Sequence, residues 1–241
     1  MRILVFLINI TLMIIAPYSG AISANETLNP LSLINNDIII EKGKVLPADH
    51  FLGNLNAPVV LIEYASFTCP HCASFAQDVF PLIKEKYIDT GKLLYIYRDF
   101  PLDAFAFKAS VLSHCYASKK HCKESCKEGD ENCCKQSRDY FNMNKALFSS
   151  LKRWSYPYQK DVTGLLEVAE IAKMTEEEFY ACIKDHEIQQ QVLTSKLYAI
   201  HQLGIDSSPI FFINGKRHDG TIKFEGFANI FNEIINLSSN K

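Results

Sequence analysis

The chain has 241 residues, of which 48% are hydrophobic and 22% are charged, and its formal net charge at pH 7 is -2. This length and composition suit one large folded domain or a domain that carries an inserted one. The near-neutral charge, without a patch of Lys and Arg, argues against nucleic acid as the main partner. The chain has 8 cysteines, an even number that favours an oxidising compartment.

Residues 1–24 have the pattern of a secretory signal peptide. Arg2 precedes an apolar run over residues 3–15, and small residues such as Ala21 and Ala24 follow it. The run is short for a bilayer span of roughly 20 residues, although an uncleaved membrane anchor is the alternative. We therefore expect export, cleavage near Ala21 to Ala24, and no stable membrane insertion afterwards.

Residues 25–57 are polar and largely irregular, and we interpret them as an N-terminal extension. Gly53 and Pro58 predict a turn at its end. The run VVLIEY over residues 59–64 is short, apolar and rich in β-formers, so it predicts a buried strand. Apolar side chains at helical spacing over residues 73–87 then predict a helix.

The motif Cys69-Pro70-His71-Cys72 stands where this strand ends and the helix begins. The first turn of a helix presents unpaired N–H groups and the positive end of the helix dipole, and both stabilise a thiolate. We therefore predict Cys69 as the reactive sulfur and Cys72 as its more buried resolving partner. Pro70 suits the first helical position, and His71 can add a hydrogen bond or, when protonated, a positive charge. A bare C-x-x-C can also be half a zinc site or a structural thiol pair, but the strand-to-helix context favours redox catalysis.

The segments after this motif continue the alternation of strand and helix. Residues 92–98 predict a second buried strand, parallel to the first because a helix crosses between them. Helical spacing then runs from residue 104 to about residue 202, and Thr175 opens a capping box with Glu178. A long helical block between two β regions is best explained as an inserted domain.

The end of the chain returns to β structure. Residues 210–213 predict a strand, and the turn Asn214-Gly215 favours a hairpin. Ile222 and Phe224 are interpreted as the return strand, and apolar spacing over residues 227–235 predicts a final amphipathic helix.

Three separated segments resemble the DsbA-like oxidoreductases of the thioredoxin fold. They are APVVLIEYASFTCPHCASF at residues 57–75, YRDFPLDAFAFK at residues 97–108 and SSPIFFINGK at residues 207–216. The resemblance implies the fold class, an α/β thioredoxin fold with an inserted all-helical domain. We place the thioredoxin-like domain at residues 58–103 and 203–241, and the inserted domain at residues 104–202.

The resemblance also implies roles for residues outside the cysteine motif. Ser208-Pro209 matches the position where the family has a cis-proline that packs beside the sulfurs and helps to bind substrate, with Ser208 tuning the redox couple. A proline that only protects the start of a strand is the simpler alternative. Glu63 matches an acidic residue beneath the active site, which implies proton transfer to the Cys72 thiol. Its alternative is a head group that reaches the surface, because burying it ionised and unpaired would be expensive.

The remaining cysteines fall into two sets. Cys115 and Cys182 lie in predicted helices, and the resemblance implies that they form a structural disulfide. The stretch HCKESCKEGDENCCK at residues 121–135 departs from the family pattern and has too few apolar side chains to be ordered by burial. We expect two disulfides there, each joining Cys122 or Cys126 to Cys133 or Cys134, with zinc binding as the alternative.

These observations lead to a functional hypothesis. The chain is expected to be a periplasmic enzyme that donates the Cys69–Cys72 disulfide to unfolded proteins that contain cysteine, with no other cofactor and no metal. The resemblance implies a membrane reoxidase as partner, either a DsbB-like quinone reductase or a VKOR-like protein. An isomerase or reductase of the same fold is one alternative. A soft-metal-binding protein that uses the cysteine-rich stretch is another.

Overall fold

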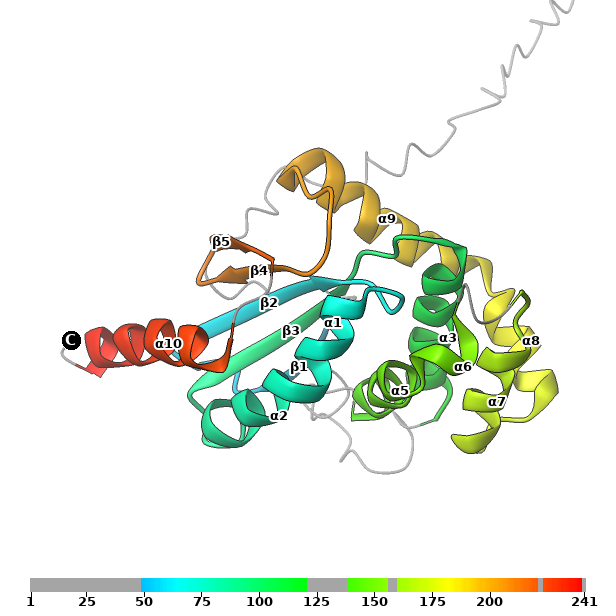
Figure 1. Cartoon of the computed structure of the whole chain (residues 1–241), viewed down its shortest axis with the longest axis horizontal. Coiled ribbons are helices and arrows are strands. Elements are labelled where there is room, and N and C mark those ends of the chain that lie inside the picture. The colour runs from blue at the N-terminus through cyan, green and yellow to red at the C-terminus, as the bar shows by residue number, and fades with distance from the viewer. Residues whose placement is uncertain (1–48, 121–137, 156–159, 221–222, 240–241) are drawn as a thin grey trace, which may run out of the picture.

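The computed structural model describes residues 49–120, 138–155, 160–220 and 223–239 (Figure 1). The expected signal peptide, most of the N-terminal extension and the cysteine-rich stretch lie outside these ranges. No helix in the described ranges combines the length and the apolar composition that a membrane span requires.

A five-stranded sheet forms the centre of the molecule, in the order β1-β3-β2-β4-β5. Its strands are β1 (His50–Gly53), β2 (Val59–Ala65), β3 (Leu93–Asp99), β4 (Ile210–Ile213) and β5 (Lys216–Asp219). Strands β2 and β3 are parallel, as predicted, and the other three pairings are antiparallel. Every residue of β2 and β3 is buried, because helices cover both faces of the sheet.

The predicted crossover helix joins β2 to β3. It consists of α1 (Pro70–Ser74), a π-helical turn (Phe75–Val79), α2 (Phe80–Ile83) and a second π-helical turn (Lys84–Ile88). Pro81 has no N–H to donate to the carbonyl four residues earlier, so an ideal α-helix cannot run through this point. The first π-helical turn lies immediately before α2, where the ladder is interrupted.

The inserted helices follow β3 and come before β4. They are α3 (Ala104–Lys120), α5 (Arg138–Ser149), α6 (Leu151–Trp154), α7 (Thr163–Ile171), α8 (Glu176–Ile183) and α9 (His186–Leu203). The capping box of Thr175 and Glu178 begins α8, as predicted. Figure 1 shows α3 and α5 to α8 gathered at one end of the sheet. Phe148 of α5 packs on Phe67, with ring centroids 5.0 Å apart, so the inserted helices share a core with the sheet.

Each face of the sheet has its own cover. The face that carries α1 and α2 is completed by α10 (Phe224–Ser239), whose Phe227 packs against Phe75 with ring centroids 5.7 Å apart. The opposite face is covered by the last turns of α9 through Ala199 and Leu203. The molecule therefore has a helix–sheet–helix core, with most of the inserted helices beside it.

Two strands differ from the sequence-based expectation. Strand β1 lies inside the segment interpreted as an irregular extension and pairs with the edge of β3. Its four residues, HFLG, include only one buried side chain, Phe51, so they carry no alternating pattern. The return strand predicted at Ile222 and Phe224 is wrong, because β5 starts at Lys216 and Phe224 begins α10. Ile222 itself lies outside the described residues.

The hairpin turn explains the position of β5. Asn214 has a φ of 47° and Gly215 a φ of 83°, as a two-residue turn with two positive φ angles requires. Such a turn starts the return strand at once. Because β5 reads KRHD and lies at the edge of the sheet, no apolar pattern marked it.

Candidate active site

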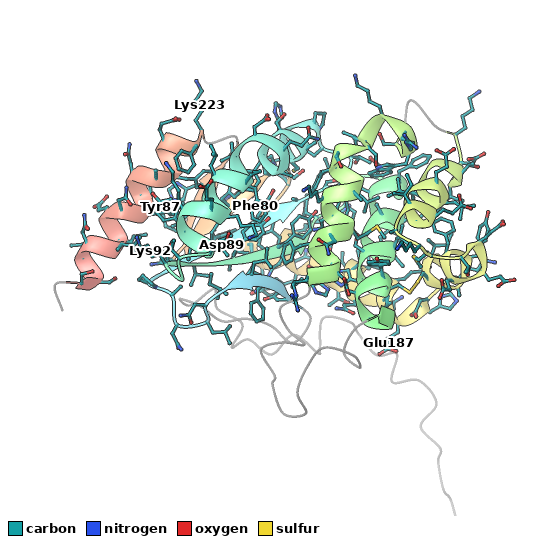
Figure 2. The ribbon with its side chains drawn as sticks, turned by 90° about the horizontal axis from the view of Figure 1, so that it is seen from below. Phe80, Tyr87, Asp89, Lys92, Glu187 and Lys223 are labelled. Carbon is teal, nitrogen blue, oxygen red and sulfur yellow. A yellow bond between two sulfur atoms is a disulfide. The ribbon has the colours of Figure 1, made fainter. Side chains whose placement is uncertain are left out.

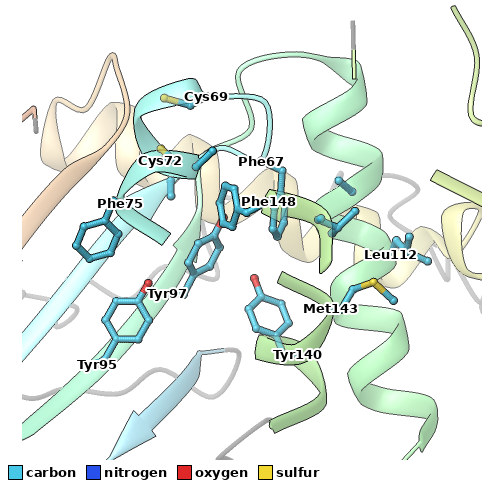
Figure 3. Packing of buried hydrophobic residues seen from close by; sticks show 14 of the residues in the cluster. Phe67, Cys69, Cys72, Phe75, Tyr95, Tyr97, Leu112, Tyr140, Met143 and Phe148 are labelled. Atoms are coloured by element: carbon cyan, nitrogen blue, oxygen red, sulfur yellow. The ribbon is translucent and has the colours of Figure 1, made fainter. Parts of the chain in front are cut away.

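The redox motif lies at the start of α1, directly after β2. Cys69 is the N-cap residue with an extended backbone, and Pro70 takes the first helical position as predicted. Both cysteines are free thiols, Cys69 being 4% exposed and Cys72 fully buried. Figure 3 shows Cys69 above Cys72 at the top of the helix, with Tyr95 and Tyr97 of β3 beneath them.

Hydrogen bonds strongly favour the thiolate of Cys69. The largest influence is the side chain of Cys72, whose thiol donates to the Cys69 sulfur and lowers the pKa of Cys69 to about 5. Burial opposes this shift, while the backbone N–H groups of Cys72 and His71 and the side chain of Ser208 support it. The side chain of His71 is exposed. The structure shows His71 acting on this sulfur through its backbone N–H.

Cys72 is held in the opposite protonation state. Burial raises its pKa well above the ordinary value of 9.0, and its bond to Cys69 and the charge of Glu63 raise it further. A thiol that keeps its proton can donate to the neighbouring thiolate. The two sulfurs of one motif therefore have clearly separated pKa values, with Cys69 as the nucleophile.

Glu63 lies beneath the pair, on β2, and is 2% exposed. The alternative in which its head group reaches the surface is therefore wrong. The Tyr95 hydroxyl donates a hydrogen bond of 2.5 Å to Glu63 Oε2. Burial nevertheless raises the pKa of Glu63 to about 8, and the charge on Cys69 adds to the rise. A carboxyl group with this pKa can hold or release a proton near neutral pH.

The Ser208–Pro209 segment comes to the same site from the far end of the sequence. Its peptide bond is cis. The Cys69 Sγ lies 3.3 Å from the backbone oxygen of Ser208, although 139 residues separate the two. The structure therefore brings together all the residues proposed for catalysis and for substrate binding.

A mostly apolar hollow of about 130 Å³ opens beside the motif. Phe75, Pro209 and Phe211 are buried residues in its lining, whereas Asp78 and Lys223 in the lining are exposed. Figure 2 shows Lys223 at the start of α10 with its side chain extending outward. The hollow offers an apolar surface with one charge of each sign to a chain that reaches Cys69.

The other cysteines stand apart from this site. Cys115 of α3 and Cys182 of α8 form a disulfide with a Cα–Cα distance of 5.5 Å, the pairing that the resemblance implied. Cys122, Cys126, Cys133 and Cys134 lie outside the described residues. Within the described ranges, no three His, Cys, Asp or Glu side chains gather in a way that could hold a metal ion.

Sequence reasoning missed a buried polar network next to the site. His50 Nε2 lies 2.9 Å from His114 Nδ1, and His114 Nε2 lies 2.7 Å from Asp99 Oδ2. The Tyr140 hydroxyl donates to the same Asp99 oxygen at 3.1 Å. These residues come from β1, β3, α3 and α5, so no local motif links them. The one signal was a carboxylate at the end of a buried strand.

Comparisons with known proteins agree with this geometry. A family model described as thioredoxin matches residues 46–233. Among solved structures, the chain is similar to alpha-DsbA1 of Wolbachia pipientis, with 40% identity and a TM-score of 0.67 over 79% of this chain and 92% of that one. It also has the fold of BdbD from Bacillus subtilis, with 17% identity and a TM-score of 0.64 over 81% of this chain and 98% of that one.

Several curated relatives come from Rickettsia species. One from Rickettsia bellii, with the provisional name of protein-disulfide oxidoreductase, is 27% identical over 198 residues, or 82% of this chain. The chain spans 69% of the length of that relative. It spans 55% of the length of a similar relative from Rickettsia felis, which is 28% identical over 71% of this chain.

Proposed function

Because the chain belongs to the thioredoxin family and, within it, to the DsbA-like proteins, we propose that it oxidises other proteins. In this proposal the Cys69–Cys72 disulfide is donated to cysteine-containing proteins that are not yet folded. The protein acts after export, in the periplasm, and uses no cofactor besides its own disulfide.

The proposed reaction is a pair of thiol–disulfide exchanges. A client thiolate attacks Cys69 Sγ, so a bond forms between the client sulfur and Cys69 and the Cys69–Cys72 bond breaks. Cys72 leaves and takes up a proton, for which the buried Glu63 carboxyl is the nearby source. A second client thiolate then attacks the client sulfur of the mixed disulfide, and Cys69 leaves as a thiolate. The client loses two electrons, and the motif gains them.

The low pKa of Cys69, about 5, is the single observation that carries this proposal. The thiolate exists only after the motif has been reduced. Every hydrogen bond that stabilises it therefore favours reduction of this protein and oxidation of its client. A thiolate of low pKa is also a good leaving group in the second exchange.

Client binding is assigned to the apolar hollow and to the segment of Ser208 and Pro209. An unfolded chain presents exposed apolar side chains, and the buried surfaces of Phe75 and Phe211 in the hollow suit them. The Ser208 backbone beside Cys69 holds the client close to the attacked sulfur.

Turnover requires that the reduced motif be oxidised again. We assign this step to a membrane protein of the DsbB or VKOR type, which passes the two electrons onward. The alternatives are an isomerase or reductase, whose motif a separate reductant must keep reduced, and a soft-metal-binding protein that uses the cysteine-rich stretch.

Equilibration with glutathione and a client assay together test the proposal. The purified oxidised protein should introduce disulfides into a reduced, unfolded client, and a C69S variant should not. In glutathione buffers, the motif should be mostly reduced at ratios that leave ordinary protein disulfides intact. A motif that stays oxidised in those buffers, beside a client that stays reduced, would establish a reductase or isomerase. Stoichiometric metal in the unreduced protein would instead favour the metal-binding alternative.

A further inference from the structure

One carboxylate fastens the loop before Cys69 to the start of the inserted domain. Asp103 directly precedes α3, and its Oδ1 accepts a hydrogen bond of 2.8 Å from the N–H of Ala106. Its Oδ2 accepts a hydrogen bond of 2.6 Å from the Thr68 hydroxyl. Asp103 therefore caps α3 with one oxygen and holds the residue before Cys69 with the other.

Ser66 closes a second link between the same two loops. Its Oγ accepts a hydrogen bond of 3.2 Å from the N–H of Leu102 and lies 3.2 Å from Thr68 Oγ1. The Thr68 hydroxyl already donates its proton to Asp103. In the contact between the two hydroxyls, Ser66 is therefore the donor and Thr68 the acceptor. The backbone oxygen of Ser66 accepts the N–H of Cys69 at 3.1 Å. We call Ser66, Thr68 and Asp103 the clasp.

The aspartate that caps α9 shows, by comparison, that Asp103 does more than cap α3. Asp185 precedes α9, and its Oδ1 accepts the N–H groups of Glu187 and Ile188, each at 3.1 Å. Both of these hydrogen bonds go to the first turn of α9, the helix that Asp185 caps. Asp103 instead gives one of its two oxygens to the loop that follows β2, the strand beside β3.

The active-site helix lacks such support of its own. Its N-cap residue is Cys69, and no side chain caps it. Most of the bonds that stabilise the Cys69 sulfur, those from Cys72 and His71, come from the first turn of α1, and they require the sulfur to stay over that turn. The position of Cys69 is therefore held by the residues that precede it in the chain, where the clasp lies.

We propose that Asp103 is a positioning residue for Cys69, acting through Thr68 so that the inserted domain sets the reactivity of the thiol pair. The inference rests on the proposed function only in taking Cys69 as the reactive thiolate. It assigns to the inserted domain a part in the chemistry in addition to any part in client binding.

The test compares four variants by the pH dependence of Cys69 alkylation in the reduced protein. Thr68→Val removes the hydroxyl, and Asp103→Ser keeps a capping oxygen on α3 but is too short to reach Thr68. Thr68→Ser keeps the hydroxyl. Asp185→Ser is the matched control, since it makes the same change at the cap of α9. Helicity and the urea midpoint are followed in each variant.

Thr68→Val and Asp103→Ser should each slow alkylation near pH 4, well below the pKa of Cys69, by about threefold or more, the effect of half a pKa unit. Thr68→Ser and Asp185→Ser should keep the profile of the parent protein. A double variant that combines Thr68→Val with Asp103→Ser should be no slower than either of these single variants. The proposal is overturned if Thr68→Val and Asp103→Ser lower the urea midpoint with an unchanged alkylation profile, or if Asp185→Ser shifts the profile equally. Alkylation needs no client and no reoxidase, so this result is independent of whether the protein proves to be an oxidase.

Discussion

At the residue scale, folding drives the two thiols of the motif apart in acidity. The pKa of Cys69 falls to about 5, and the pKa of Cys72 rises well above 9.0. Iodoacetamide reacts with thiolates, so it should label Cys69 at pH 6 and leave Cys72 unlabelled. Peptide mapping after brief labelling of the reduced protein measures this directly. Preferential modification of Cys72 would reverse the two assignments.

Glu63 makes a separate prediction about stability and pH. Its pKa rises on folding from 4.5 to about 8, so between these values the folded state holds a proton that the unfolded state has lost. The contribution of Glu63 to the free energy of unfolding is fully present below pH 4.5. It is lost as the pH rises towards 8, at about 1.4 kcal/mol per pH unit.

The measurement is urea unfolding of the reduced parent protein and of Glu63→Gln at several pH values. Glutamine cannot titrate, so the variant should gain stability relative to the parent protein as the pH rises from 5 to 8. Taking the difference between the two proteins cancels groups with the opposite trend, such as Cys69. Parallel stability curves would show that Glu63 does not carry the shifted proton.

At the element scale, a buried ion pair fastens the entry of β1 to β3. Arg98 donates from Nε and Nη2 to the two oxygens of Asp49, each at 2.8 Å, and from Nη1 to the Tyr64 hydroxyl at 2.9 Å. The side chains of Arg98 and Asp49 are each 5% exposed. Strand β1 is short and has only Phe51 buried, so this pair adds to the four-residue ladder that joins β1 to β3 at the edge of the sheet.

Asp49→Asn should therefore destabilise the protein by about 3 kcal/mol, because it leaves a buried guanidinium without its counter-charge. Asp89→Asn is the control, since Asp89 pairs with Lys84 on the surface, with the two side chains 52% and 45% exposed. That exposed pair should be worth less than about 1 kcal/mol. Equal urea midpoints for the two variants would contradict the role of the buried pair.

At the scale of the whole molecule, the two redox states should differ in stability in an unusual direction. A disulfide normally stabilises a fold, but here reduction creates a thiolate that the folded state holds well. The reduced protein should be the more stable form at pH 8. Because the pKa of Cys69 is lowered from 9.0 to about 5, this advantage should shrink as the pH falls from 9 to 5.

Paired unfolding of the oxidised and reduced protein at pH 5 and pH 8, with Cys115–Cys182 left intact, measures the difference. A constant difference between the two states across this range would show that the Cys69 proton is not linked to folding. An oxidised form that is more stable at both pH values would weaken the oxidase proposal.

Local patterns explain which parts of the molecule the sequence predicts. The buried runs of β2 and β3, the helix after Cys69 and the capping box of α8 each lie within one short stretch, so they were predictable. Strand β5 was not, because an edge strand of four polar residues needs no apolar face. Ser208 and Pro209 entered only through the family resemblance, since nothing near them in sequence points to Cys69.

Two sets of polar contacts that join several elements were not predicted. The His50, His114 and Asp99 network and the bond between Thr68 and Asp103 join residues that no spacing rule relates. They depend on how the inserted helices pack beside the sheet, which a periodic pattern does not specify.

The separation of Cys69 from Ser208 has a consequence for biosynthesis. During translation the motif emerges first, and Ser208 follows 139 residues later. At roughly 5 to 20 residues per second, that interval is on the order of ten seconds. Strand β4 cannot pair with β2 until it has been made, so Ser208 and Pro209 reach the sulfurs only late in synthesis. Throughout that interval the nascent chain presents its cysteines as an unfolded polypeptide, open to the same kind of thiol exchange that its finished form is proposed to perform on others.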